Sequence, residues 1–247
     1  MTRKSHFALP LTGNLTKFAA TLVGAAAIAA PAHAGTISFE SADPYAIFAS
    51  GDSYYESGYR LTFEDFDFAG AGTAVGAIVD SSDPFNCMNT SCPNNGSLYY
   101  GAINDSVVII NSVTDRAQFQ LKSIDASFIG AGAVLDEFPI ISGYLRMLGV
   151  FANNSYVTID IPLFGPDSDG FAFDKWNMSP AVAAMNFVQL EMFGFACTQA
   201  SCTAFTSNQA QFAIDNIVLA EVPEPATAAI FGLGLMGLIA GARRRKA

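Results

Sequence analysis

Hydrophobic and polar residues alternate along most of the chain after residue 35. In one such run, Tyr59, Leu61 and Phe63 fall on one face of an extended strand, and Arg60 and Thr62 fall on the other. Further runs lie at 36–41, 74–79, 107–110, 117–124, 142–151, 156–161, 187–193 and 212–219. Gly, Pro, Asn and Asp separate these runs, and helical character is confined to a short stretch of the body, 179–186. The pattern predicts an all-β fold, a single antiparallel β-sandwich over residues 35–220.

The first 34 residues have the three-part layout of a secretory signal peptide. Residues 1–17 are polar and basic, residues 18–30 are apolar, and small residues lead up to Ala34. We therefore expect a signal helix in 1–34, cut by signal peptidase between Ala34 and Gly35. The alternative is an uncleaved N-terminal anchor, although this apolar stretch is short for a bilayer.

A second apolar segment lies near the end of the chain. Residues 226–242 contain no charged side chain and reach the lower length limit of a transmembrane helix. They are followed by a basic end, which consists of Arg243, Arg244, Arg245 and Lys246. Positive charge favours the cytoplasmic side, so the body is expected on the outer side of the inner membrane.

A short proline-containing motif precedes this span and consists of Val222, Pro223, Glu224 and Pro225. The motif (222–225), the span (226–242) and the basic end (243–246) follow one another within 221–247, and together they resemble the PEP-CTERM sorting signal. The resemblance implies a substrate of an exosortase, a membrane protease, in a Gram-negative bacterium that makes exopolysaccharide. It also implies transient anchoring in the inner membrane and a final place at the cell surface or in the extracellular matrix. A plain C-terminal anchor is the alternative.

Short segments of the body resemble jelly-roll domains of the carbohydrate-binding-module type. Ser38–Glu40 and Phe212–Ile217 are similar to the first and last strands of such domains, and Leu121–Phe128 is similar to a strand between them. Val75–Phe85, with the following Cys87, resembles an uncharacterised subfamily of PEP-CTERM proteins. These resemblances imply a jelly-roll-like sandwich.

The body is strongly acidic, since residues 35–222 contain 21 Asp and Glu against 5 Lys and Arg, a net charge of −16. Such a surface repels phosphate backbones, so nucleic acid is not expected as a partner. It attracts divalent cations, but it is also the surface that keeps an exported domain in solution.

Histidine is absent from the body, because His6 and His33 both lie in the signal segment. This excludes Ser-His-Asp and Cys-His catalysis. A glycoside hydrolase would need two carboxylates across a groove, and nothing marks out one pair among so many acids. No catalytic residue is predicted, and we expect the protein not to be an enzyme.

The four cysteines form two closely spaced pairs, Cys87 with Cys92 and Cys197 with Cys202. Paired cysteines of exported proteins form disulfides, and each of these bridges would close a small loop. The alternatives are cross pairing between the two pairs and a four-cysteine metal site.

The resemblance to jelly-roll modules implies a structural Ca²⁺ held by acids of the first and last strands. Glu40 and Asp215 stand at the matching positions. Ca²⁺ takes six to eight oxygen ligands, so Asp52 is a third candidate. The alternative is that these acids lie exposed at strand ends. Apart from this Ca²⁺, no cofactor is expected.

Five aromatic residues lie in turn-rich segments, where exposed rings would bind sugars: Tyr54, Tyr55, Tyr99, Tyr100 and Trp176. The alternative is that these rings pack beneath the loops. As a whole, the sequence predicts a non-enzymatic surface or matrix protein with a structural or adhesive role linked to exopolysaccharide. A carbohydrate-binding module is the first alternative, and a secreted hydrolase with paired carboxylates is the second.

Overall fold

The computed structural model describes residues 34–65, 72–83, 90–131, 138–206 and 209–222. The chain divides into a compact unit, Ala32–Val222, and a second unit made of its two ends, Met1–Pro31 and Pro223–Ala247. The predicted signal helix and C-terminal transmembrane helix lie outside the described residues. Within the described residues, no helix is long and apolar enough to cross a membrane.

The predicted antiparallel β-sandwich is confirmed. Sheet 1 has the strand order β13-β9-β16-β7-β5-β2, and β1 also pairs with β16. Its strands are β1 (Ala34–Ile37), β2 (Ile47–Ala49), β5 (Ala74–Asp80), β7 (Leu98–Ala102), β9 (Phe119–Phe128), β13 (Asp174–Asn177) and β16 (Phe212–Glu221).

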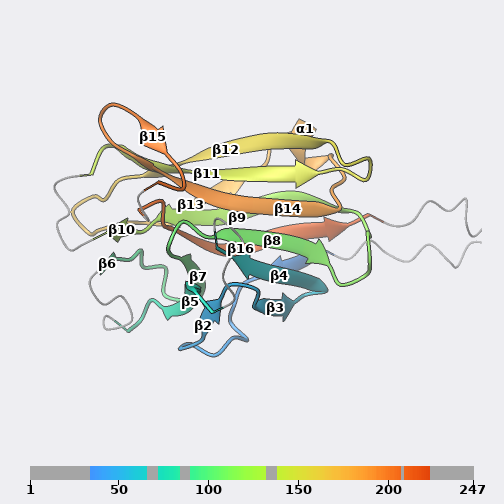
Figure 1. The fold of residues 1–247 in the computed structure, drawn as a ribbon, viewed down its shortest axis with the longest axis horizontal. Coiled ribbons are helices and arrows are strands. Elements are labelled where there is room, and N and C mark those ends of the chain that lie inside the picture. The colour runs from blue at the N-terminus through green and yellow to red at the C-terminus, as the bar shows by residue number, and fades with distance from the viewer. Residues whose placement is uncertain (1–33, 66–71, 84–89, 132–137, 207–208, 223–247) are drawn as a thin grey trace, which may run out of the picture. The chain divides into compact units, whose positions relative to one another are not determined.

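Sheet 2 has the order β12-β11-β14-β8-β4-β3, and β15 also pairs with β14. Its strands are β3 (Ser53–Glu56), β4 (Tyr59–Glu64), β8 (Val107–Ser112), β11 (Ile141–Val150), β12 (Tyr156–Phe164), β14 (Gln189–Cys197) and β15 (Cys202–Thr203). A small third sheet pairs β6 (Thr90–Ser91) with β10 (Gly130–Ala131). In Figure 1, β9 and β16 of sheet 1 lie behind β14 and β8 of sheet 2.

The period-two alternation of sheet 2 separates a buried face from an outer face. In β4, Tyr59, Leu61 and Phe63 are fully buried, whereas Arg60, which lies between Tyr59 and Leu61, is exposed. In β11, Leu145 and Met147 point into the core in the same way. The inward side chains of both sheets form one hydrophobic cluster, so the core fixes which residues of sheet 2 face outward.

Aromatic rings fill the end of the core near β2, β4 and β7. The rings of Phe63 and Tyr100 stack with their centroids 4.4 Å apart, and Phe48 lies 4.4 Å from Phe63. Tyr99 and Tyr100 are both fully buried, so the sequence-based expectation that these two rings bind sugars is wrong. Their segment is the central strand β7, covered on both faces, and such a strand lacks alternation.

The helical content of the described residues is one short turn, α1 (Pro180–Ala183), inside the predicted stretch. Ser179 caps it by accepting a hydrogen bond from the Val182 backbone N–H at 3.4 Å, and Pro180 occupies the first turn.

Candidate functional site

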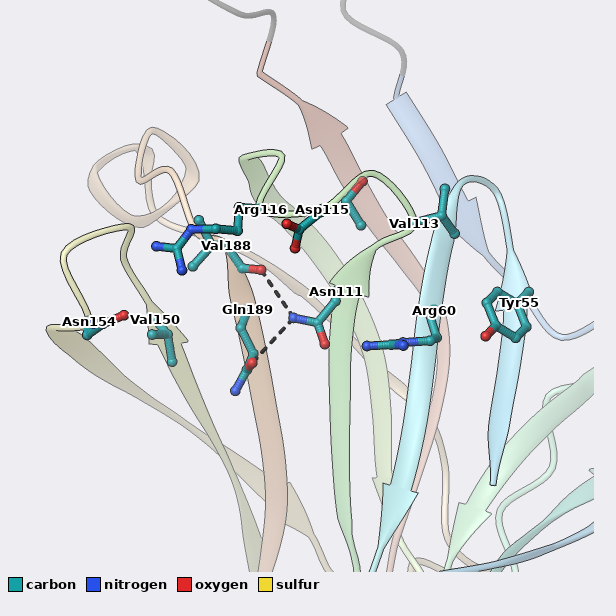
Figure 2. A pocket seen from close by; sticks show the side chains of 11 residues that line it. Tyr55, Arg60, Asn111, Val113, Asp115, Arg116, Val150, Asn154, Val188 and Gln189 are labelled. Carbon is teal, nitrogen blue, oxygen red and sulfur yellow. Dashed lines mark hydrogen bonds between the residues drawn. The ribbon is translucent and has the colours of Figure 1, made fainter. Parts of the chain in front are cut away.

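A polar groove of about 480 Å³ lies at one end of the outer face of sheet 2. Its polar wall consists of Tyr55, Arg60, Asn111, Ser112, Asp115, Arg116, Asn154 and Gln189, and Val113, Val150 and Val188 complete the lining. Figure 2 shows these side chains gathered over the ends of neighbouring strands. The groove therefore collects side chains that lie up to 134 positions apart in the sequence.

The strand register places the floor of the groove in one row across the sheet. Tyr55 of β3 is opposite Arg60 of β4, and Arg60 is opposite Asn111 of β8. The Asn111 side-chain amide donates to Gln189 Oε1 of β14 and to the Val188 carbonyl, both at 3.3 Å. The ring of Tyr55, the guanidinium of Arg60 and the amides of Asn111 and Gln189 thus lie side by side on neighbouring strands.

The loop after β8 supplies the rim of the groove. Arg116 adopts a left-handed backbone conformation with φ of 54°, and its Nη2 donates to the Ala152 carbonyl at 2.9 Å. This bond ties the loop to the turn between β11 and β12, where Asn154 also lines the groove. The rim is therefore formed by the loop after β8 and the β11–β12 turn, which the Arg116–Ala152 hydrogen bond joins.

Side-chain packing covers other parts of this outer face. Arg146 donates to both carboxylate oxygens of Asp160 at 2.7 Å and lies 4.7 Å from the centroid of the Phe195 ring. Phe205 covers Phe193, with the ring centroids 4.9 Å apart.

Two of the five cations of the acidic body line the groove. Arg146 and Asp160 form the one ion pair with an N···O distance below 4 Å among the described residues. Arg60 and Arg116 therefore have no carboxylate partner among these residues. Asp115 is the one carboxylate of the lining, so the lining residues carry an excess of one positive charge, and Glu191 outside the lining accepts a hydrogen bond from Gln189.

The groove offers polar and aromatic groups to a ligand. An exposed tyrosine ring beside amide and guanidinium donors offers a stacking surface and hydrogen bonds to hydroxyl groups. A glycosidase needs two carboxylates, and Asp115 is the one carboxylate among the described lining residues.

Of the predicted sugar-binding rings, one reaches the groove. Tyr55 is 61% exposed and lies in the lining. Tyr54 points the other way, stacks on Phe39 at 5.5 Å, and donates its hydroxyl hydrogen to Glu56 Oε2 at 3.1 Å. Burial raises the pKa of Tyr54.

Trp176 does not line the groove. It lies on β13 at the edge of sheet 1, is half-buried, and stacks on Phe164 with centroids 6.2 Å apart. Tyr54 and Trp176 therefore take part in packing. Sequence reasoning missed Asn111, Arg116 and Gln189, since their proximity depends on strand register and no local motif marks them.

Of the three candidate calcium ligands, Glu40 and Asp215 both accept hydrogen bonds from the segment 95–98, whereas Asp52 accepts one from its own turn. Glu40 Oε1 accepts from the Leu98 backbone N–H at 3.1 Å, and Asp52 Oδ2 accepts from the Ala49 N–H at 2.7 Å. Asp215 is buried and is bonded to other side chains. No group of three or more potential metal ligands is found in the described residues, and calcium binding stays a prediction.

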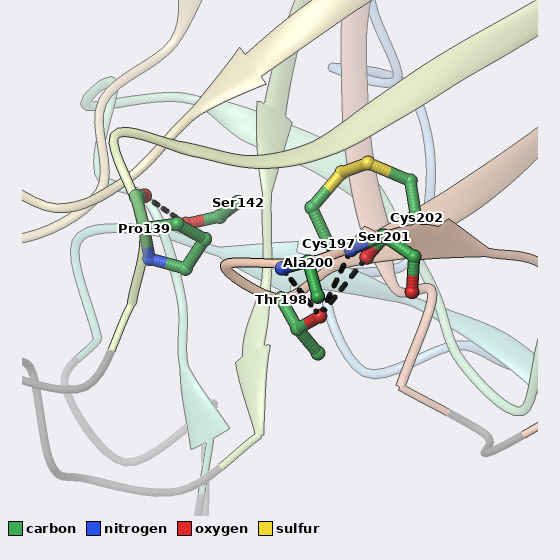
Figure 3. The surroundings of a disulfide bond; sticks show 7 residues. All are labelled: Pro139, Ser142, Cys197, Thr198, Ala200, Ser201 and Cys202. Carbon is green, nitrogen blue, oxygen red and sulfur yellow. Dashed lines mark hydrogen bonds between the residues drawn. A yellow bond between two sulfur atoms is a disulfide. The ribbon is translucent and has the colours of Figure 1, made fainter.

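Cys197 and Cys202 form the predicted disulfide, which closes the β14–β15 hairpin (Figure 3). This bond excludes cross pairing with the other two cysteines. Cys92 is also disulfide-bonded, and Cys87 lies outside the described residues.

The predicted signal cleavage site lies within β1. Ala34 is opposite Ala220 and Gly35 is opposite Leu219 in the ladder with β16. A protease reads an extended, unpaired chain, so cleavage between Ala34 and Gly35 would have to precede this pairing. Cleavage there stays a prediction.

The two ends of the sandwich meet in this ladder, and the C-terminal end continues into the proline-containing motif. Val222 is the last described residue, and its N–H donates to the Gln118 carbonyl at 2.9 Å. Residues 221–246 match the family described as the PEP-CTERM protein-sorting motif. This segment is a PEP-CTERM sorting motif. The motif implies export, anchoring in the membrane through the C-terminal end before processing, and sorting by an exosortase.

Comparison with curated proteins gives no match. Two solved structures are similar to the body at low identity. One is the CBM22-2 xylan-binding domain from Paenibacillus barcinonensis Xyn10C, with 10% identity, a TM-score of 0.33, and coverage of 76% of this chain and 98% of that one. The other is the enzymatically active domain of bacteriophage CBA120 tailspike protein 4, with 14% identity, a TM-score of 0.27, and coverage of 67% of this chain and 20% of that one. Both TM-scores are too low for a ligand or an activity to be transferred to this chain.

Proposed function

We propose that the β-sandwich of this PEP-CTERM protein is a non-catalytic domain that binds polysaccharide outside the cell. In this role the exported protein serves as a structural or adhesive component of the cell surface or extracellular matrix. The proposal brings together the structural role and the carbohydrate-binding role that the sequence suggests as separate readings.

The observation that carries the proposal is the row of side chains on the floor of the groove. Tyr55 is 61% exposed although it lies on a strand, and its neighbour across the ladder is Arg60. The polar face of a sugar needs several donors and acceptors, and Arg60 supplies donors. Internal bonds of Asn111 and Gln189 leave Asn111 Oδ1 as an acceptor and one N–H of Gln189 Nε2 as a donor. Its apolar face needs a ring, which Tyr55 supplies.

The groove suits a chain-like ligand bound at the surface. It is open on the outer face of the sheet, and its volume of about 480 Å³ holds a few sugar units. Because a polysaccharide repeats its units, weak binding at one groove still retains a protein in a matrix that offers many such sites.

Gel retardation of the domain spanning residues 35–222 in soluble polysaccharides tests the proposal. This domain carries the complete hydrophobic core of the described residues. Tyr55→Ala should weaken binding about tenfold, equivalent to ~1.4 kcal/mol, because it removes the exposed ring.

Two further variants serve as controls. Tyr45 is 68% exposed but lies outside the groove lining, so Tyr45→Ala should leave binding unchanged. Trp176→Ala should lower the melting temperature but leave binding to the native fraction intact. Absence of retardation by every polysaccharide, or equal loss in Tyr45→Ala and Tyr55→Ala, would refute the proposal.

A further inference from the structure

The cations of the body are distributed unevenly over the sandwich, and this distribution bears on the ligand. Lys122 donates to the Ala183 carbonyl at 2.7 Å, and Arg146 is held by Asp160. Arg60 and Arg116 line the same groove and, like Lys122 and Lys175, form no ion pair with a carboxylate among the described residues. The body has 21 acidic and 5 basic residues, so two arginines at one groove suggest a binding role for them.

Arg60 has the surroundings of an anion receptor. Tyr55 and Asn111 flank it in the cross-strand row, and Figure 2 shows its guanidinium directed toward Asn111. Both neighbours are uncharged, so nothing beside Arg60 in this row neutralises it. A guanidinium is planar and donates two parallel hydrogen bonds, which matches a carboxylate group.

Arg116 adds positive charge at the rim while its position stays fixed. Its Nη2 is bonded to the Ala152 carbonyl, which leaves the other guanidinium N–H groups available for a ligand. Asp115 lies beside it and offsets part of the charge. The lining residues thus carry an excess of one positive charge, and the nearby carboxylate of Glu191 is bonded to Gln189.

The remainder of the body opposes a densely charged polyanion. At physiological ionic strength, charges separated by more than about 8 Å are largely screened. An anionic sugar seated in the groove therefore experiences mainly the groove, whereas a highly charged chain that extends over the acidic surface would be repelled. Isolated carboxylates spaced along a sugar chain meet both conditions.

We propose that the groove binds an acidic polysaccharide and that Arg60 binds the carboxylate of a uronic acid unit. Asn111 and Gln189 bond to hydroxyl groups of the same or the adjacent unit, and Tyr55 packs against a sugar face. Arg116 adds favourable charge from the rim. This inference rests on the proposed polysaccharide-binding function and names its ligand class.

A polygalacturonate in which most carboxylates are methyl-esterified, a neutral galactan and a sulfated galactan are the three probes for a gel-retardation test of the 35–222 domain. In this polygalacturonate the free carboxylates are isolated along the chain. The unmodified domain should bind polygalacturonate most tightly, and raising NaCl from 50 to 500 mM should weaken this binding several-fold. Arg60→Gln should weaken it roughly ten- to a hundredfold, because a charge-assisted hydrogen-bond pair is lost.

The matched control is Lys175→Gln, which removes one positive charge from an exposed position outside the groove lining. It should leave polygalacturonate binding within about twofold, which separates a local contact from an effect of net charge. Arg60→Lys keeps the charge but loses the planar donor pair, so its affinity for polygalacturonate should fall between those of the unmodified domain and Arg60→Gln. Equal melting temperatures establish that the variants are folded.

The possible outcomes separate this inference from the proposed function. Tighter binding of the neutral or the sulfated galactan than of polygalacturonate refutes the carboxylate proposal and leaves polysaccharide binding intact. Equal losses in Arg60→Gln and Lys175→Gln also refute it. Failure to bind any of a broad set of polysaccharides would refute both.

Discussion

Asp215 is the buried acid whose surroundings decide how the sandwich responds to pH. Its side chain is 1% exposed and accepts hydrogen bonds from Asn95 Nδ2 at 2.8 Å, Ser97 Oγ at 3.0 Å and the Asn216 N–H at 2.7 Å. Burial raises the pKa of Asp215 to about 6 despite these donors, and the carboxylate of Asp125 on the neighbouring strand adds to the increase.

This raised pKa predicts a gain of stability on mild acidification. The pKa of an aspartate in the unfolded chain is about 4, so between pH 4 and 6 the folded state binds more protons. Stability from Asp215 is therefore fully present near pH 4 and is lost as the pH rises through 6. The change amounts to roughly 2–3 kcal/mol.

Urea denaturation at pH 4.5 and 7.5 measures the effect. In Asp215→Asn, this component of the pH dependence should disappear. The variant should also be less stable at both pH values. Its amide N–H₂ group would face the N–H and O–H donors that bond to the carboxylate of Asp215. The same difference in stability between the two pH values in the variant and in the unmodified domain would contradict the assignment.

The β14–β15 hairpin is closed by a disulfide bond. Thr198 donates its backbone N–H to the Ser201 carbonyl at 2.8 Å, and the Cys197–Cys202 bond lies just outside this turn. Beyond the hairpin, Phe205 packs on Phe193 of the sheet face. The disulfide thus holds a segment that covers the outer face of sheet 2.

Replacing both cysteines by serine should lower the free energy of unfolding by about 2 kcal/mol, because the closed loop is short. Urea denaturation should show a lower midpoint with an unchanged slope. Binding should persist, since Cys197 and Cys202 lie outside the groove lining. An unchanged midpoint would show that the hairpin is held by its other contacts alone.

The alternation of hydrophobic and polar residues predicts the strands of sheet 2 well, because one face of this sheet packs on the core and the other faces solvent. The expected runs 59–63, 107–110 and 156–161 coincide with the cores of β4, β8 and β12. The segment Leu98–Ala102 escapes detection, because both faces of β7 are covered and its residues show no alternation.

At the scale of the whole molecule, the sequence predicts sorting more fully than binding. The PEP-CTERM motif is contiguous, so it can be identified without knowledge of the fold. The groove unites Tyr55, Asn111 and Gln189 through the order and register of β3, β4, β8 and β14. The alternation of residues predicts which positions face outward. It does not predict which of these positions become neighbours in the folded sheet.

The central claim is that the sandwich binds polysaccharide through this groove. Amide chemical-shift mapping of the 35–222 domain tests it most directly, with oligosaccharides of polygalacturonate and of neutral galactan as titrants. Shifts should concentrate at residues 55–60, 111–116 and 188–189. Shifts concentrated on β13 or on the strands of sheet 1, or no shifts with either titrant, would contradict the account.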